Sequence, residues 1–217
     1  ERGPALLGVS RSATGKLWRD RLDARGAARA LAITQRYQLP EMLARVLAGR
    51  DVGIDEVEDF LDPTIRKLMP DPYTVTQMET AARRIADAAM RAEKVAIFGD
   101  YDVDGATSSA LLAWHLRHCG LVPLIHIPDR IFEGYGPNVE AVRALAARDA
   151  TLLVTVDCGT TSFEPLAEAR RLGMSVVVID HHQTAEDLPE VDAMVNPNRP
   201  DDLSGLGHLA AVGLVLV

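Results

Sequence analysis

Short apolar runs alternate with helical segments from residue 94 to the end of the chain. The runs KVAIFGD, LVPLIHIPD, TLLVTVD and MSVVVID are rich in branched apolar residues and are typical of buried strands. The patterns between them predict helices over residues 106–120, 137–149 and 162–173. A short strand is expected within DAMVNPN, and a further helix is expected to begin near residue 207. This alternation predicts an α/β fold, with a parallel, Rossmann-like sheet flanked by helices.

Helical patterns also occupy the first 90 residues. Helices are expected over residues 28–48, with an interruption at Pro40, and within GIDEVEDFLDP and TVTQMETAARRIADAAMRAE. We therefore predict a helical N-terminal extension, residues 1–90, and a catalytic α/β domain, residues 91–217. Because the chain begins with Glu1 and ends within the apolar stretch LAAVGLVLV, we expect a fragment whose catalytic domain is truncated at its C-terminus.

The composition favours a folded protein of a reducing compartment. Apolar residues make up 47% of the 217 residues, which is enough for a sizeable core. Two cysteines, Cys119 and Cys158, are too few for a disulfide framework. The polar, arginine-rich start does not resemble a signal peptide, and no apolar run approaches the roughly 20 residues that span a bilayer. We therefore expect a cytoplasmic protein with no membrane contact.

The net charge of −8 is distributed unevenly. Residues 1–36 contain eight Arg and Lys against three Asp and Glu, whereas residues 101–217 contain seven against sixteen. The acidic second half argues against a broad electrostatic coating of DNA, but it does not exclude a substrate held at one local site. The basic start could contact nucleic acid, although such a run is more commonly a solvated or linker segment.

Acidic and histidine residues follow three of the expected strands. They are Asp100, Asp102 and Asp104 in FGDYDVDG, Asp157 in TLLVTVDCG, and Asp180, His181 and His182 in VVVIDHH. Because parallel strands end at one edge of a sheet, we expect these side chains to lie together. Carboxylates gathered there would repel each other unless a cation lay between them. The pattern therefore predicts a metal site that holds two ions.

Three known loop motifs that could explain the first acidic cluster lack residues that they require. An EF-hand loop starting at Asp100 would need Glu at its twelfth position, which is Leu111. The aspartyl-phosphate loop of haloacid-dehalogenase-like phosphatases needs a later lysine, but no lysine follows Lys94. A dinucleotide-binding loop would need G-x-G-x-x-G after the first strand, and this pattern is missing. A solvated acidic turn is the remaining structural alternative, and three carboxylates after a buried strand make it costly.

The adjacent histidines make the metal prediction more specific. Because neighbouring residues at a strand end point in different directions, one of His181 and His182 can bind a metal while the other faces substrate. Asp180 could orient an imidazole through a hydrogen bond. Asp157 could instead cap the following helix, but Thr160 and its neighbours are available as caps, which leaves this carboxylate free.

The three motifs FGDYDVDG, VTVDCG and VIDHH resemble, in order, the first three motifs of the DHH phosphoesterase superfamily. The segment PDRIFEGYG, residues 128–136, is similar to the RecJ-type branch of single-stranded-DNA-specific exonucleases. The resemblance covers about residues 94–217. It implies metal-dependent hydrolysis of phosphodiester bonds with two Mn²⁺ or Mg²⁺ ions, in a 5′-to-3′ exonuclease that acts on single-stranded DNA in recombination and repair.

The resemblance also implies a set of metal ligands. Carried over by position, Asp102 would serve the first metal, and Asp104 and His181 would serve the second. Asp157 would bridge both ions. An imidazole among oxygen ligands shifts the preference from Mg²⁺ towards Mn²⁺.

Further roles follow from the same resemblance. His182 would contact the scissile phosphate and act with Asp104 and Asp157 as the catalytic set, while Asp180 would support the histidines. Many relatives have a histidine four residues before the first matching aspartate, where this chain has Phe98. Asp100 is the expected replacement ligand. A later aspartate ligand of the family has no match before residue 217.

The helix after the first motif is expected to contribute to phosphate binding. Its N-terminal amides, near Gly105, would favour an anion, and the hydroxyl groups of Thr107 or Ser108 could donate to it. Ordinary capping of the helix accounts for these residues equally well.

Arg130 and Tyr135 lie in a glycine-rich loop after the second strand. In the RecJ-type interpretation they would contact a DNA phosphate and a base face, respectively. The alternative is a surface loop in which Arg130 forms an ion pair with Glu133.

Two alternative functions remain open from the sequence. Another DHH-type phosphoesterase could act on oligonucleotides, cyclic dinucleotides or polyphosphate. A non-catalytic nucleic-acid-binding module could also keep the fold, but its motif positions would usually be eroded. In the preferred interpretation the partners are single-stranded DNA and the missing downstream domains of the same chain, and the isolated fragment is weakly active or inactive.

Overall fold

The computed structural model describes residues 5–217, which divide into two compact units. The first unit ends at Met69 and the second begins at Pro70. No helix in the described part of the chain is long and apolar enough to cross a membrane.

The N-terminal unit is helical, as the sequence predicts. It contains α1 (Ala24–Tyr37), α2 (Glu41–Gly49), α3 (Val57–Leu61) and α4 (Ile65–Leu68), with 3-10 turns η1 (Leu6–Gly8) and η2 (Ile54–Glu56). Pro40 precedes α2 and separates it from α1, because a proline is tolerated at a helix start but not in its interior. The core of this unit is built around Ile33, Leu47 and Val57.

The C-terminal unit contains one five-stranded, all-parallel sheet. Its strands are β1 (Val95–Gly99), β2 (Leu124–His126), β3 (Leu152–Val156), β4 (Ser175–Ile179) and β5 (Ala193–Val195). They are arranged in the order β2-β1-β3-β4-β5. The central strands β1 and β3 are buried along their whole length, which accounts for their continuous apolar sequences.

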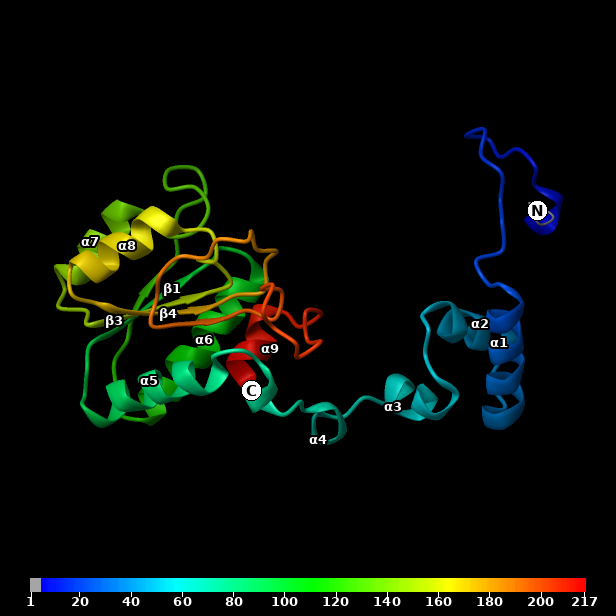
Figure 1. Ribbon diagram of the computed structural model, residues 1–217, viewed down its shortest axis with the longest axis horizontal. Coiled ribbons are helices and arrows are strands. Elements are labelled where there is room, and N and C mark those ends of the chain that lie inside the picture. The colour runs from blue at the N-terminus through cyan, green and yellow to red at the C-terminus, as the bar shows by residue number, and fades with distance from the viewer. Residues whose placement is uncertain (1–4) are drawn as a thin grey trace. The chain divides into compact units, whose positions relative to one another are not determined.

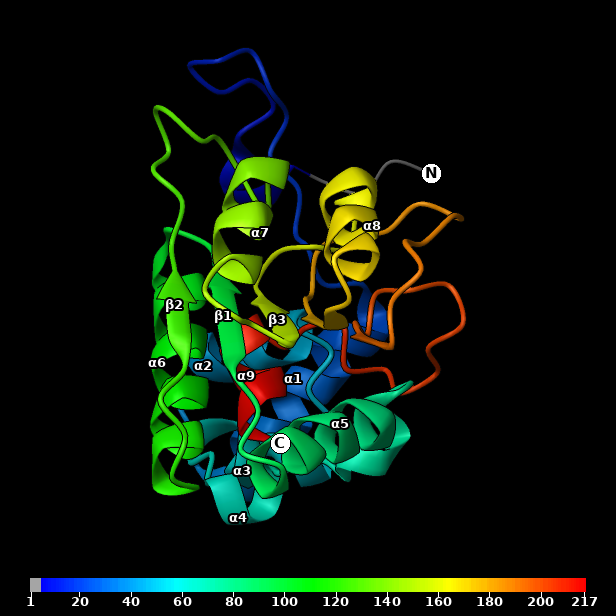
Figure 2. The ribbon, with the colours of Figure 1, turned by 90° about the vertical axis from the view of Figure 1, so that its left-hand side faces the viewer.

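Helices cover both faces of this sheet. On one face lie α5 (Met78–Met90), α6 (Val103–His118) and α9 (Ala211–Leu216), and on the other lie α7 (Val139–Ala146) and α8 (Phe163–Arg171) (Figure 1). The turned view shows the same separation (Figure 2). Each face has its own apolar core, because the side chains of a strand alternate between the two faces. The expected α/β fold is confirmed.

The unit boundary lies earlier in the chain than the expected boundary at residues 90 and 91. The sequence pattern places α5 in the N-terminal extension, but its residues Ala81 and Ala88 share an apolar core with Ile97 of β1. Gln77, at the start of α5, also accepts a hydrogen bond from the backbone N–H of Met194 in β5 (2.7 Å). Helix α5, preceded by the 3-10 turn η3 (Pro72–Thr74), is therefore part of the α/β unit.

The strand register places the ends of β1, β3 and β4 at one level. Gly99 is paired with Val156, and Val156 is paired with Ile179. The next residues are Asp100, Asp157 and Asp180, respectively. The chain order reverses between β1 and β3, since β2 lies on one side of β1 and the later strands on the other. Ligands bind at such switch points in open α/β sheets.

Candidate metal centre

Asp157 is the common member of two groups of closely spaced acidic and histidine side chains. One group is Asp157, His181 and His182, and the other is Asp100, Asp102 and Asp157. Within each group, one potential ligand atom from every residue lies within 4.8 Å of the others. The side chains that follow β1, β3 and β4 therefore converge, as the strand-end argument predicts.

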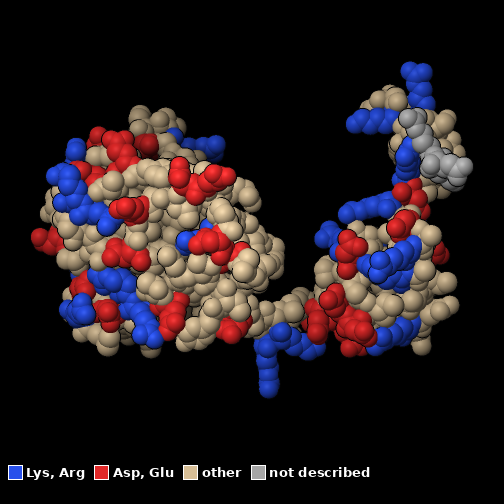
Figure 3. Space-filling model, viewed as in Figure 1, with Lys and Arg blue, Asp and Glu red and all other residues tan. Residues whose placement is uncertain are grey.

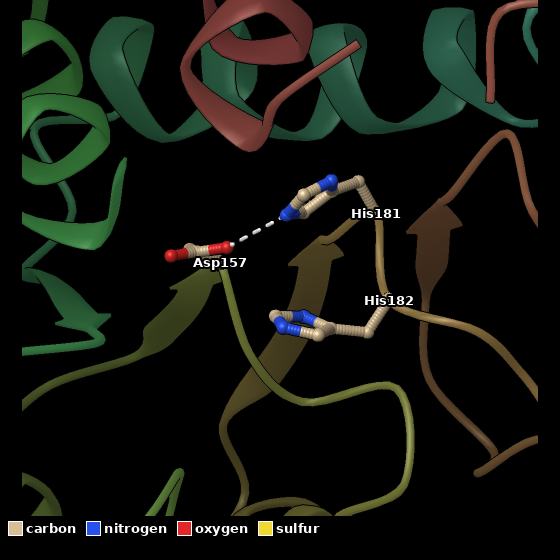
Figure 4. A group of neighbouring side chains, drawn as sticks. All are labelled: Asp157, His181 and His182. Atoms are coloured by element: carbon tan, nitrogen blue, oxygen red, sulfur yellow. Dashed lines mark ion pairs between the residues drawn. The ribbon is translucent and has the colours of Figure 1, made fainter. Parts of the chain in front are cut away.

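His181 points from the end of β4 towards the carboxylate of Asp157 (Figure 4). Its Nε2 atom is 3.3 Å from Oδ1 of Asp157 and 3.5 Å from Oδ2 of Asp104. The ring of His182 lies beside it, with ring centroids 4.9 Å apart. One imidazole thus lies between two carboxylates from separate elements, β3 and α6, which suits a shared cation.

The carboxylate of Asp157 is buried and accepts no hydrogen bond in the described chain, although it lies 3.3 Å from Nε2 of His181. Its residue is 1% exposed, and within residues 5–217 neither carboxylate oxygen has a hydrogen-bond partner. Burial raises the pKa of Asp157 to about 8, and the negative charges of Asp104 and Asp102 act in the same direction. An unpaired buried carboxylate is costly unless a proton or a cation neutralises it. These side chains therefore fit a divalent cation, because their oxygen and imidazole donors suit Mg²⁺ or Mn²⁺.

The loop after β1 holds two carboxylates in different environments. Asp102 is exposed and caps α6 by accepting a hydrogen bond from the N–H of Gly105 (3.0 Å), which lowers its pKa. Asp100 is buried, and in the part of the chain described its Oδ1 has no partner. Burial raises the pKa of Asp100, so its environment resembles that of Asp157.

Gly105 allows α6 to approach this loop closely. A Cβ atom at Gly105 would lie 2.5–2.7 Å from the backbone N, C and O atoms of Asp100. Backbone atoms cannot yield as a flexible side chain can, so the glycine is required to place Asp100 and Asp102 beside Asp157. The structure thus gives Gly105 a positional role in the site, in addition to the helix terminus predicted from sequence.

Asp104 makes an interaction that the sequence does not reveal. Its two carboxylate oxygens accept hydrogen bonds from the N–H groups of Ala211 (2.7 Å) and Val212 (2.8 Å) at the start of α9. The same carboxylate lies 3.5 Å from His181. Asp104 therefore ties α9 to the site, and its remaining lone pairs are available to a cation.

His182 is held by Asp180. Oδ1 of Asp180 is 2.7 Å from Nδ1 of His182 and also accepts from the backbone N–H groups of His181 and His182. Burial alone would raise the pKa of Asp180, but the hydrogen bonds from His182 and Thr160 outweigh it and lower the pKa to about 2. In turn the hydrogen bond to Asp180 raises the pKa of His182. An ionised Asp180 can only accept, so Nδ1 of His182 donates to it, and Nε2 lies 3.5 Å from the hydroxyl group of Tyr135.

Sequence reasoning missed two asparagines in this region. Asn196 is fully buried and donates to the carbonyl oxygen of His182, and Asn198 donates to that of His181. Asn196 directly follows β5, so it occupies the same edge as the aspartates that follow β1, β3 and β4. The strand-end rule applied to the fifth strand would have identified it.

Neither helix hydroxyl group expected to bind phosphate is both free and exposed. The hydroxyl group of Thr107 donates to the carbonyl oxygen of Val103 (2.7 Å), one turn earlier in α6. Thr107 is therefore used within the helix and not for binding phosphate. The hydroxyl group of Ser108 is buried and has no hydrogen-bond partner in the described chain.

The loop between β2 and α7 brings Tyr135 to the site. Its hydroxyl group donates to the carbonyl oxygen of Asp157 (3.3 Å) and lies 3.3 Å from Nδ1 of His182. The guanidinium group of Arg130 lies over the ring of Tyr101, 5.2 Å from its centroid. Glu133 pairs with His126 (2.8 Å) and not with Arg130, so the alternative ion pair is not formed among the residues described.

These features define a class of protein: a doubly covered parallel α/β domain with an acidic, histidine-lined centre at the carboxyl edge of its sheet. Residues 94–216 match the family model described as "DHH family, N-terminal domain". The chain belongs to the DHH family, as its three motifs predict.

Curated relatives with this sequence pattern are single-stranded-DNA-specific exonucleases named RecJ. The chain is 34% identical to RecJ of Bacillus subtilis (strain 168) over 183 residues, which cover 84% of this chain and 23% of the relative. It is 37% identical to RecJ of Dickeya dadantii (strain 3937) over 177 residues, covering 81% and 30%, respectively. The chain thus spans 23% and 30% of the length of these two relatives.

Solved structures support the same fold. A structure of exonuclease RecJ bound to manganese is 33% identical and superposes with a TM-score of 0.56, covering 63% of this chain and 34% of that one. RecJ from Thermus thermophilus in complex with Mn²⁺ is 27% identical, with a TM-score of 0.63, covering 87% and 26%.

Proposed function

We propose that this chain forms the catalytic part of a metal-dependent phosphodiesterase that removes nucleotides from single-stranded DNA in the 5′-to-3′ direction. The observation that carries the proposal is the buried carboxylate of Asp157, which accepts no hydrogen bond in the described chain and lies between further aspartates on one side and His181 on the other. The names of the relatives support the substrate class. A role in recombination and repair, in the cytoplasm, is part of the proposal.

Two divalent ions, Mn²⁺ or Mg²⁺, fit the two groups of side chains that share Asp157. Asp100 and Asp102 would hold one ion with Asp157. His181 would hold the other with Asp157, and Asp104, 3.5 Å from His181 but outside both groups, would be a further ligand. When bound, such ions activate water at neutral pH and stabilise the charge that develops on a phosphate. The protein contributes the shape of the site and the fixed orientation of each donor.

The remaining side chains would orient the substrate. Nδ1–H of His182 donates to Asp180, so Nε2, which lies beside the hydroxyl group of Tyr135, would meet the scissile phosphate. Tyr135 supports the backbone of Asp157 and presents an aromatic face that is half exposed. Arg130, stacked on Tyr101, provides a positive charge near these residues. The hydroxyl group of Ser108 is fully buried and that of Thr107 donates to Val103, so neither is presented to a substrate.

The surface is consistent with a locally held strand. Acidic and basic side chains are interspersed over the face of the C-terminal unit in view (Figure 3). Affinity for the DNA backbone would therefore depend on contacts at the site and on other parts of the whole protein, since charge neutralisation drives non-specific binding.

The test is a comparison of substrates with the longest available form of the protein. Single strands carrying a label at either the 5′ or the 3′ end, duplex DNA and dinucleotides are incubated with Mn²⁺, with Asp157→Ala as the inactive control. Release of mononucleotides from the 5′ end of single strands is expected. Preference for dinucleotides would favour another DHH-type phosphoesterase, and equal activity of the control variant would contradict the proposal. Residues 1–217 alone are expected to bind Mn²⁺ with weak or no nuclease activity.

A further inference from the structure

The segment Asn196-Pro197-Asn198 follows β5 and contacts the two histidines only through their backbone. Asn196 is fully buried, and its amide group is completely used. Its Nδ2 donates to the carbonyl oxygen of His182 (3.0 Å) and to Oγ1 of Thr160 (2.9 Å), while its Oδ1 accepts from the N–H of Asn198 (2.8 Å). A buried amide whose two donors and one acceptor are all paired fixes its neighbours in one arrangement.

Asn198 holds His181, the residue before His182, by its backbone. Its Nδ2 donates to the carbonyl oxygen of His181 and to that of Gly207 (3.3 Å). A Cβ atom at Gly207 would collide with Oδ1 of Asn198, so a larger residue there would displace the asparagine side chain from this contact. The two asparagines thus hold the carbonyl groups of successive histidines from one side.

The contacts of Asn196 close a ring of hydrogen bonds around His182. Thr160 receives the bond from Asn196 on its hydroxyl group and donates its own N–H to Oδ2 of Asp180 (3.0 Å). Asp180 in turn accepts hydrogen bonds from the ring and from the backbone N–H of His182. The carbonyl oxygen of His182 accepts from Asn196, which completes the ring. The side-chain position of His182 and the path of its backbone are therefore coupled.

We propose that Asn196 and Asn198 are positioning residues that fix the two histidines against Asp157. This inference rests on the proposed function, because it treats the histidine-lined centre as a metal site. Donor atoms must be held closely for tight coordination, and removing the partners that orient metal ligands typically weakens metal affinity about 10–100-fold. Neither asparagine needs to touch the ion or the substrate for this effect.

The test measures Mn²⁺ affinity of the metal-free 217-residue chain by titration calorimetry, beside its unfolding midpoint. Asn196→Ala and Asn198→Ala are compared with Asn138→Ala, which removes the same side chain from the N-cap of α7. Thr160→Val, which removes one acceptor of the ring at nearly unchanged volume, is the second variant if Asn196→Ala does not fold. The ring tautomer of His182 is read by ¹⁵N NMR without metal.

We expect Asn196→Ala and Asn198→Ala to weaken Mn²⁺ binding about 10–100-fold. Asn138→Ala should lose stability yet keep its affinity within about twofold, and Thr160→Val should show a smaller loss than Asn196→Ala. In Asn196→Ala the Nδ1-protonated tautomer of His182 should no longer dominate. Unchanged affinity in both asparagine variants, or an equal loss in Asn138→Ala, overturns the positioning role while the metal site stands. Failure of the unmodified chain to bind Mn²⁺ overturns both the positioning role and the metal site of the proposed function.

Discussion

The two halves of the centre are built in opposite ways. In the histidine loop, residues 180–182, the polar groups are paired: Asp180 accepts from His181 and His182, and the carbonyl groups of both histidines receive asparagine donors. In the carboxylate cluster, Asp100, Asp102 and Asp157, buried oxygens of Asp100 and Asp157 lack partners in residues 5–217.

The difference shows in which half the protein satisfies its buried polar groups without a bound ion. Networks with every polar group satisfied hold one geometry, whereas unpaired buried charges are tolerated only where something else neutralises them. The histidine loop is therefore preformed, and the carboxylate cluster requires a proton or a cation. Changes in the cluster should act directly on metal binding and on pH dependence. Changes in the residues that hold the loop should lower stability and should weaken metal binding only through the position of His181.

The largest expected effect comes from Asp157→Ala. Because Asp157 belongs to both groups of side chains, its loss should abolish Mn²⁺ binding, well beyond the roughly 10–100-fold effect typical of residues outside the coordination shell. Asp100→Ala, which affects one group, should bind Mn²⁺ more weakly than the unmodified chain but measurably. Titration calorimetry of both variants decides, and equal losses would count against a bridging role.

The second effect is on the pH dependence of stability without metal. The pKa of Asp157 rises from 3.8 unfolded to about 8 folded, so between these values the folded state holds a proton that the unfolded state has released. Stability should therefore fall as pH rises from about 4 to 8, by at most about 1.4 kcal/mol per pH unit.

Urea unfolding of Asp157→Asn across this range should give a flatter curve than the unmodified chain. Asp192→Asn is the matched control, because this carboxylate accepts from Val176 near the opposite edge of the sheet. A curve for Asp157→Asn parallel to that of the unmodified chain would contradict the raised pKa of Asp157.

A smaller effect with the opposite sign is expected in the histidine loop. The folded pKa of Asp180, about 2, lies below its unfolded value of 3.8, so its contribution to stability is present above pH 4 and is lost as pH falls towards 2. Asp180→Asn should cost about 2 kcal/mol of stability at pH 7 and nothing below pH 2. Chemical unfolding of both proteins at both pH values measures this loss of stability. A loss that persists in acid would show that it comes from packing and not from the charge of Asp180.

The smallest effect tests the contact between the two halves. The hydroxyl group of Tyr135 donates to the carbonyl oxygen of Asp157 and lies beside His182. Tyr135→Phe keeps the aromatic ring and should cost about 0.5–1.5 kcal/mol of stability, with Mn²⁺ affinity nearly unchanged. Thermal unfolding and calorimetry on the same samples check this, and a loss of metal affinity would make Tyr135 part of the metal site.

The convergence of the site could be predicted from sequence because it depends on local rules. Apolar runs identify the strands, parallel strands share an edge, and the residues after them must meet there. The place of α5 could not be predicted, since its amphipathic pattern shows an apolar face but not what covers it. The bonds from Asp104 to the start of α9 join residues more than 100 positions apart, and no local pattern records them.

The most direct measurement is anomalous X-ray scattering at the manganese absorption edge from crystals of this chain grown with Mn²⁺. We expect manganese peaks within about 2.1–2.3 Å of the carboxylate oxygens of Asp157, one towards Asp102 and one towards His181. Manganese bound elsewhere, with the Asp157 carboxylate left uncoordinated, would contradict the account.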